Sequence, residues 1–211
     1  MTAAVEVVLG SASPARLRVL RQAGLDPRVL VADLDEDGLI AELGAAPPAE
    51  IVSRLAVAKA DALVPRLDSA DAVLLTCDSM LHLRGELMGK PHTPEVARAR
   101  WKQMSGQSAD LLTGHCVTRI RDGAPVDRAT DTESTEIRFA RVDDATIDAY
   151  VATGEPLAVA GAFTLDGLGG WFVNGIDGDP SSVLGIGLPL TRRLLARVDV
   201  DVTTLWAPDA R

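Results

Sequence analysis

The sequence predicts an α/β or mixed α+β fold, built on a sheet that contains both parallel and antiparallel strands. Candidate strands and helices alternate in the first half of the chain, which is typical of parallel strands joined by helices. A long hairpin in the middle requires antiparallel pairing. Of the 211 residues, 47% are hydrophobic and only 3% aromatic, so one domain with an aliphatic core can form.

The first strand and helix meet at a turn that suits an anion. Residues 5–9 are a short apolar run, which predicts a buried strand ended by a glycine. Ser11 and Ser13 can cap the following helix, and Pro14 suits its first turn. Free N–H groups, serine hydroxyls and the Arg16 guanidinium therefore point to one spot, where a phosphate is the favoured anion. An ordinary capped helix with a solvated arginine is the alternative.

Up to residue 90, the chain predicts a short strand, an acidic loop, a long helix, a buried strand and a small hairpin. These cover, in that order, residues 27–31, 33–37, 45–65, 71–77 and 81–87. Residues 45–48 (Ala-Ala-Pro-Pro) open the long helix, whose apolar residues recur at helical spacing. The strand at 71–77 is a continuous apolar run that is expected to stop at Asp78.

After residue 90, the chain predicts a helix, two long strands, a helix, a strand within a glycine-rich stretch, a helix and a last strand. These cover, in that order, residues 94–104, 109–120, 126–142, 143–151, 169–176, 189–198 and 202–206. Thr93 can cap the first of these helices, and Ser105 and Gly106 close it. A hairpin loop at 121–125 joins the two long strands.

Composition and charge exclude several classes of function. The net charge is −9 and the pI about 4.8, which argues against a nucleic-acid or anionic-membrane surface. No apolar run reaches the length of a membrane span, and no signal peptide is evident. Cys77 and Cys116 lack a CxxC spacing and are expected to be reduced, buried thiols. We therefore expect a cytoplasmic protein without nucleic-acid or membrane partners.

Three further polar residues stand where predicted elements end, as ligand sites do in open α/β sheets. Lys59 falls inside the apolar stripe of the long helix, so it either snorkels past the core or reaches into a cleft. Asp78 follows a buried strand, where it can hold a metal, activate water or merely form a turn. Lys90 stands between Gly89 and Pro91, which restricts its direction, although this tripeptide is also an ordinary turn.

Common nucleotide motifs are missing from the chain. There is no GxxxxGK[ST] sequence and no GxGxxG after a strand, so neither a P-loop nor a dinucleotide fold is supported. The histidines His82, His92 and His115 lack metal-ligand spacing. Each is expected to be a surface or hairpin residue rather than a catalyst.

Several short motifs occur in a fixed order along nearly the whole chain. The first is S-x-S-P-x-R, which spans residues 11–16. The others are Ala58-Lys59-Ala60, Cys77-Asp78-Ser79, Gly89-Lys90-Pro91, Ser105-Gly106, Thr113-Gly114, Gly154-Glu155-Pro156, Ala160-Gly161-Ala162-Phe163, Ile176-Asp177-Gly178-Asp179 and Gly187-Leu188-Pro189. Each is weak alone, but together the chain resembles the Maf family, the septum-formation-inhibitor-like nucleoside triphosphate pyrophosphatases.

The resemblance implies a hydrolase of acid anhydrides in nucleotide metabolism. Such enzymes cut a nucleoside triphosphate between the α and β phosphates, giving a monophosphate and pyrophosphate, and use Mg²⁺ or Mn²⁺. The implied fold is an elongated, twisted mixed sheet flanked by helices around a central cleft, as in inosine-triphosphatase-like housecleaning enzymes. One such domain would span residues 1–211, with two lobes around the cleft as one arrangement, and a homodimer is left open. The alternative is a nucleotide-binding regulator of cell division with little catalysis.

The resemblance also assigns roles to residues of this chain. Ser11 and Arg16 would hold phosphate, and Ser79 would also bind the substrate. Lys59 and Lys90 would neutralise the triphosphate and count among the catalytic residues. Asp78 would bind metal or orient the attacking water. Glu36, or its neighbour Asp35, would add metal-binding charge in the acidic loop. These assignments suit the chemistry, because cleavage loads negative charge onto the leaving pyrophosphate.

Two departures from the family pattern concern the substrate. Ala15 replaces the first of two arginines that often follow the proline, which removes one phosphate contact. Asp166 stands where pyrimidine-preferring members carry glutamine, and Phe163 and Ser79 replace a tyrosine and a threonine. An ionised Asp166 can only accept hydrogen bonds, so it favours a base edge that offers donors, or a cationic base such as a methylated guanine. The resemblance therefore leaves base preference open.

Overall fold

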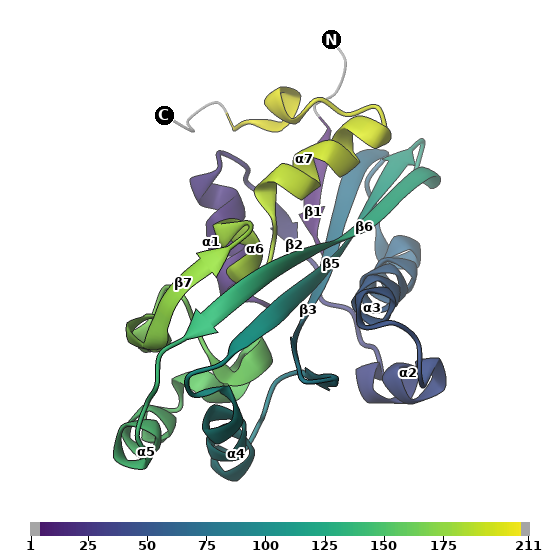
Figure 1. The fold of residues 1–211 in the computed structure, drawn as a ribbon. Helices are drawn as coiled ribbons and strands as arrows, with labels where there is room; N and C mark the ends of the chain where they lie inside the picture. Colours follow the sequence, from purple (N-terminus) through teal and green to yellow (C-terminus); the bar gives the residue numbers. More distant parts are fainter. Residues whose placement is uncertain (1–4, 208–211) are drawn as a thin grey trace.

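A mixed sheet runs through the centre of the molecule in the computed structural model, which describes residues 5–207 (Figure 1). Within these residues the sheet has seven strands in the order β2-β1-β3-β5-β6-β7, with β4 paired to β3. They are β1 (Glu6–Leu9), β2 (Arg28–Val29), β3 (Asp71–Leu83), β4 (Glu86–Met88), β5 (Ser108–Arg121), β6 (Ala124–Phe139) and β7 (Val173–Asp177). β1 is parallel to β2 and β3, and the other pairings are antiparallel. The predicted mixed class is confirmed.

Helices flank this sheet. The α-helices are α1 (Pro14–Gln22), α2 (Glu36–Leu43), α3 (Pro48–Leu63), α4 (Pro94–Met104), α5 (Asp144–Ala152), α6 (Pro180–Val183) and α7 (Leu188–Arg197). Short 3₁₀ helices cover Val64–Arg66, Glu155–Ala158, Ala160–Ala162, Leu168–Phe172 and Val202–Leu205. In Figure 1, α1 and α7 lie across the sheet from α3, and α4 and α5 lie together near one end. Among residues 5–207, no helix combines the length and apolar character needed to cross a membrane.

Alternate residues of β3 face different helices, as the two-residue period of a strand requires. Leu75 and Cys77 pack in the cluster that contains α1 and α7, whereas Leu74 packs with α3. Cys116 belongs to the α3 side. The two cysteines are therefore buried on opposite faces of the sheet, and both are free thiols. This confirms that they are buried and unpaired, as the sequence predicts.

A second core holds the glycine-rich stretch against the sheet. Trp101 of α4 is fully buried and makes edge-on contacts with Phe139, Tyr150 and Phe172. Its indole N–H donates a 2.7 Å hydrogen bond to the carbonyl of Ala162. Buried indoles usually need such a partner, so this bond fixes the stretch that follows α5.

Four predicted boundaries are wrong. In the glycine-rich stretch, where a strand is predicted over 169–176, Leu168–Phe172 form a 3₁₀ helix and the strand begins only at Val173. The predicted acidic loop at 33–37 ends in helix α2, which begins at Glu36. The Asp35 carboxylate caps this helix by accepting from the Gly38 N–H at 2.9 Å. Strand β3 does not stop at Asp78; it continues to Leu83 because its pairing with β5 runs on without a break. The predicted last strand at 202–206 is a 3₁₀ turn, which the Asp201 side chain caps.

Candidate active site at the open edge of strand β3

One edge of β3 is covered at both ends but not in the middle. β1 pairs with residues 72–75 of β3, and β4 pairs with residues 81–83 on the same edge. Between them, residues 76–80 have a strand neighbour only on the β5 side among the described residues. The loop after β1 enters this gap, where the Gly10 N–H donates to the Leu75 carbonyl at 2.8 Å. Side chains from α1, α2 and α3 can therefore meet Asp78 and its neighbours here.

Arg16 reaches the gap from the first turn of α1. Its Nη1 donates to the carbonyl of Cys77 at 2.9 Å and to the hydroxyl of Ser11 at 3.0 Å. Its Nη2 donates to the Ser79 hydroxyl at 3.1 Å, and its Nε donates to the Gly185 carbonyl at 2.7 Å. A guanidinium has five N–H donors, so these four bonds leave one Nη2 hydrogen for a ligand. Arg16 is 9% exposed and is an organised part of the site rather than a solvated cation.

The Ser11 hydroxyl is oriented by the same contacts. Its oxygen accepts from Arg16 and also from the Ser13 N–H at 3.2 Å. A hydroxyl has two lone pairs and one proton, so both acceptor positions are used and the proton is left to donate. The sequence prediction that Ser11, Arg16 and the start of α1 converge is confirmed in geometry. The ordinary-cap alternative accounts only for Ser13, whose oxygen accepts from the Arg16 N–H at 3.4 Å.

Lys59 lies on the other side of the same edge and joins two carboxylates. Its ammonium is 2.5 Å from Asp78 Oδ1 and 3.0 Å from Glu36 Oε1. The side chains of Lys59 and Asp78 are only 11% and 10% exposed, whereas that of Glu36 is 43% exposed. Lys59 therefore reaches inward instead of snorkelling, and of the two acidic candidates Glu36, not the capping Asp35, is the one that contacts it.

Burial governs the electrostatics of Asp78. Loss of hydration raises the pKa of the Asp78 carboxyl, and the neighbouring Glu36 charge acts in the same direction. The Lys59 ammonium and the Arg16 guanidinium oppose this rise, because both stabilise the charged form. Such a carboxylate is a stronger base than an exposed one, which suits a group that takes a proton from water.

Two predicted site residues are not joined to these groups. Lys90 is exposed and makes no polar contact with them among the described residues. It follows Gly89, where an added Cβ would be 3.6 Å from the Met80 methyl, two positions beyond Asp78 on β3. Asp166 instead forms an ion pair with Arg18, on a different side of α1 from Arg16. Both roles stay predictions.

The donor set fits a divalent metal that the substrate helps to bind. Two carboxylates, from Glu36 and Asp78, converge on one cation, which in this structure is the Lys59 ammonium. Within residues 5–207, no group of three or more His, Cys, Asp or Glu side chains could hold a metal alone. Mg²⁺ commonly takes one or two carboxylates and completes its shell with substrate phosphates and water. The residues present meet that requirement.

Sequence reasoning missed the groups that hold Arg16 from behind. The Gly185 carbonyl lies 169 positions away in the chain, and only the glycine-rich composition around it hinted at a functional turn. His115 lies in the long hairpin, as expected, but its side chain is buried at 1% exposure rather than on the surface. Thr113 is also buried, and its side-chain hydroxyl lies 3.0 Å from the Ser79 hydroxyl.

Asp78 and Ser79, adjacent in β3, thus belong to two sets of side chains. Ser79 contacts Arg16, in a set that can hold a phosphate. Asp78 contacts Lys59, in a set that can balance charge and accept a proton. On a mixed α/β sheet, this combination suits an enzyme for a phosphorylated small molecule. A family model described as Maf-like protein matches residues 6–198. The chain belongs to this family, as its motifs predict.

Curated relatives align along almost the whole chain, and all three described here are named nucleoside triphosphate pyrophosphatase. The protein from Nocardia farcinica (strain IFM 10152) is 61% identical over 208 residues, which are 97% of this chain and 98% of the relative. The protein from Rhodococcus jostii (strain RHA1) is 60% identical over 208 residues, or 97% of each chain. That from Mycobacterium sp. (strain JLS) is 55% identical over 204 residues, covering 95% and 97%.

Proposed function

We propose that this protein is a nucleoside triphosphate pyrophosphatase, which hydrolyses the bond between the α and β phosphates and releases a nucleoside monophosphate and pyrophosphate. One observation carries the proposal. Asp78, the buried carboxylate paired with Lys59, is adjacent in β3 to Ser79, which accepts from Arg16. A group that can activate water therefore lies beside groups that can hold a phosphate, in the segment of β3 that neither β1 nor β4 covers. The names of the close relatives support the same activity.

Several residues of this protein would together bind the triphosphate. The Ser11 hydroxyl, the remaining Nη2 hydrogen of Arg16 and the N-terminus of α1 donate to phosphate oxygens. Ser79 adds a hydroxyl on the same side, and the Lys59 and Lys90 ammonium groups neutralise charge on the triphosphate. Fixed donors of this kind stabilise the charge that builds up on the leaving pyrophosphate.

Asp78 orients the attacking water and accepts its proton. Its pair with Lys59 favours the ionised carboxylate and opposes the effect of burial, and Glu36 contacts the same ammonium. Asp78 and Glu36 would also hold Mg²⁺ or Mn²⁺, which when bound neutralises phosphate charge and activates water. The Lys59 ammonium, which contacts both carboxylates, would neutralise phosphate charge beside them.

The test is a product analysis over a panel of nucleoside triphosphates with Mg²⁺ or Mn²⁺, including methylated GTP. We expect pyrophosphate and monophosphate in equal amounts and no turnover after chelation of the metal. Inorganic phosphate without pyrophosphate would contradict the bond assignment. The alternative, a regulator of cell division, is not favoured; it would show tight nucleotide binding by calorimetry with no turnover over hours.

Further parts of the proposal concern context. A cytoplasmic location stays a prediction. Asp166 would favour a base edge with donors or a cationic base, as in a housecleaning enzyme that removes modified nucleotides. A single domain over residues 1–211 and a homodimer both stay predictions, and the first includes residues outside the described 5–207.

A further inference from the structure

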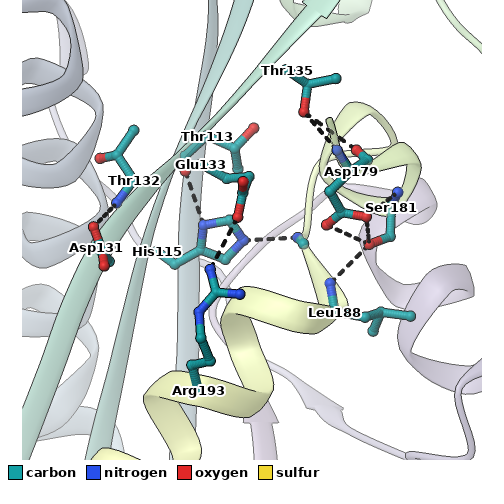
Figure 2. Close-up of polar contacts among 11 residues, drawn as sticks. Thr113, His115, Asp131, Thr132, Glu133, Thr135, Asp179, Ser181, Leu188 and Arg193 are labelled. Carbon is teal, nitrogen blue, oxygen red and sulfur yellow. Dashed lines mark hydrogen bonds and ion pairs between the residues drawn. The ribbon is translucent and has the colours of Figure 1, made fainter. Parts of the chain in front are cut away.

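His115 is a buried imidazole that the proposed mechanism does not use. It lies on β5 and faces the turn between α6 and α7, as Figure 2 shows. Its Nδ1 is 2.9 Å from the Thr113 carbonyl, and its Nε2 is 2.8 Å from the backbone nitrogen of Gly187. A carbonyl can only accept, so Nδ1 carries the proton and Nε2 accepts the Gly187 N–H. Both ring nitrogens are thereby satisfied by backbone groups.

Burial keeps this ring neutral. Burial, together with the nearby Arg16 charge, lowers the pKa of His115 to about 4, although the Thr113 carbonyl and the Asp179 and Asp131 carboxylates act in the opposite direction. Only a neutral imidazole has the Nε2 lone pair that the Gly187 N–H requires. The acceptor is therefore present throughout the neutral pH range.

The turn that His115 holds is the turn that holds Arg16. Gly187 is two residues beyond Gly185, whose carbonyl accepts from Arg16 Nε at 2.7 Å. Between them, Ile186 is fully buried, so the turn has little freedom to shift on its own. A Cβ at Gly187 would be 2.8 Å from the Asp179 carboxylate, which shows how closely this backbone is packed.

Neighbouring contacts secure the same turn and the same strand. The Ser181 hydroxyl accepts from the Leu188 N–H at 2.8 Å and donates to the Asp179 carboxylate (Figure 2). On β5, Thr113 has its side chain on the same face as His115 and contacts Ser79. Thr113 thus supports Arg16 Nη2 through Ser79. His115 supports Arg16 Nε through the turn that contains Gly185 and Gly187.

We propose that His115 is a positioning residue for Arg16, which it orients by anchoring the Gly185–Gly187 turn to β5. This rests on the proposed role of Arg16 as a phosphate ligand. Without the Nε2 acceptor, the Gly187 N–H is left unpaired in a buried site, and the turn moves to find another partner. The Gly185 carbonyl moves with it, so Arg16 loses the bond that fixes the direction of its free Nη2 hydrogen.

The experiment compares His115→Leu, which removes the acceptor, with His115→Gln, whose side-chain oxygen can accept from Gly187. The readouts are KM and kcat for the best nucleoside triphosphate and the Kd for inorganic pyrophosphate by calorimetry. For His115→Leu we expect KM and Kd to rise by about tenfold or more, with a smaller change in kcat. For His115→Gln we expect values within about threefold of the wild type.

A double-mutant cycle with Arg16→Lys separates positioning from general damage. If His115 acts through Arg16, then His115→Leu adds little to the loss already caused by Arg16→Lys. The proposal is overturned if the effects of His115→Leu and Arg16→Lys multiply in the double variant. It is also overturned if His115→Gln is as impaired as His115→Leu. If His115→Leu does not fold, His115→Asn replaces it, because its shorter side chain is polar but does not reach Gly187.

Failure of the proposed function would look different. In that case the wild type itself would release no pyrophosphate from any nucleotide. The pyrophosphate Kd would still test His115, since Arg16 and Ser11 would remain an anion site. An unchanged Kd in the leucine variant, with the wild type binding pyrophosphate, would refute positioning whatever the reaction is.

Discussion

Gly114 lies directly against the backbone of helix α3, and adding one methyl group there should displace the helix that carries Lys59. Gly114 lies opposite Asp78 in the β3–β5 register. A Cβ at this position would be 2.3 Å from the Val52 carbonyl oxygen and 2.6 Å from the Ser53 nitrogen. Both are backbone atoms of α3, so no side-chain rotation can relieve the overlap. The helix must move outward by about 1 Å to restore ordinary contact.

The size of the effect follows from that movement. Overpacking that forces backbone shifts in a core costs about 1–3 kcal/mol. The loss of chain entropy in the unfolded state offsets about 0.4–1 kcal/mol of this, as for any Gly→Ala change. Lys59 lies two helical turns beyond Val52, on the same side of α3, and a 1 Å misplacement of a catalytic group can reduce the rate about a hundredfold.

Urea unfolding and the rate of pyrophosphate release measure both effects. Gly114→Ala should lower the free energy of unfolding and reduce kcat by about ten- to a hundredfold. Gly89→Ala is the control for stability, because its added Cβ would meet only the Met80 methyl, at 3.6 Å. The reasoning is refuted if Gly114→Ala unfolds at the same urea concentration as the control variant and retains the wild-type kcat.

Three other predictions concern pH, the glycine-rich stretch and the base. The folded-state pKa of His115 is lowered to about 4 from 6.5, so the unfolded chain binds the proton first. Stability should therefore fall as pH drops from about 6.5 towards 4, by up to about 3 kcal/mol in the wild type but not in His115→Gln, as measured by urea unfolding at each pH. Glu155 accepts from the Gly169 N–H at 3.0 Å, and Glu155→Gln should lower Tm by leaving donors less well satisfied. Asp166→Asn breaks the ion pair with Arg18 and should change the ratio of kcat/KM between purine and pyrimidine triphosphates; an unchanged ratio would exclude Asp166 from base recognition.

Local patterns singled out Arg16, Lys59 and Asp78 among the side chains that converge on β3, whereas Glu36 and Ser79 followed only from the family resemblance. The capping residues of α1 fix where Arg16 starts, and the apolar stripe of α3 fixes the face on which Lys59 lies. The end of a continuous apolar run singled out Asp78, although the strand does not end there and continues to Leu83. Sequence left open whether Lys59 snorkels or reaches inward. The structure decides this because Asp78 supplies a buried carboxylate within 2.5 Å.

Contacts between distant segments could not be predicted in this way. Nothing near Gly185 in the sequence indicates that its carbonyl meets Arg16, and the burial of His115 depends on the turn before α7. The direction of Asp166 likewise depends on Arg18, which lies 148 positions earlier. Motif order gave the family, but the network behind Arg16 required the three-dimensional arrangement.

The central claim is that Asp78 activates water at the open edge of β3. The most direct measurement is the rate of pyrophosphate release by Asp78→Asn, with Asp144→Asn, an exposed change on α5, as the matched control. We predict that Asp78→Asn loses about 10²–10³-fold in kcat while remaining folded, and that the control keeps the wild-type rate. A folded Asp78→Asn protein that releases pyrophosphate as fast as the wild type would contradict the mechanism.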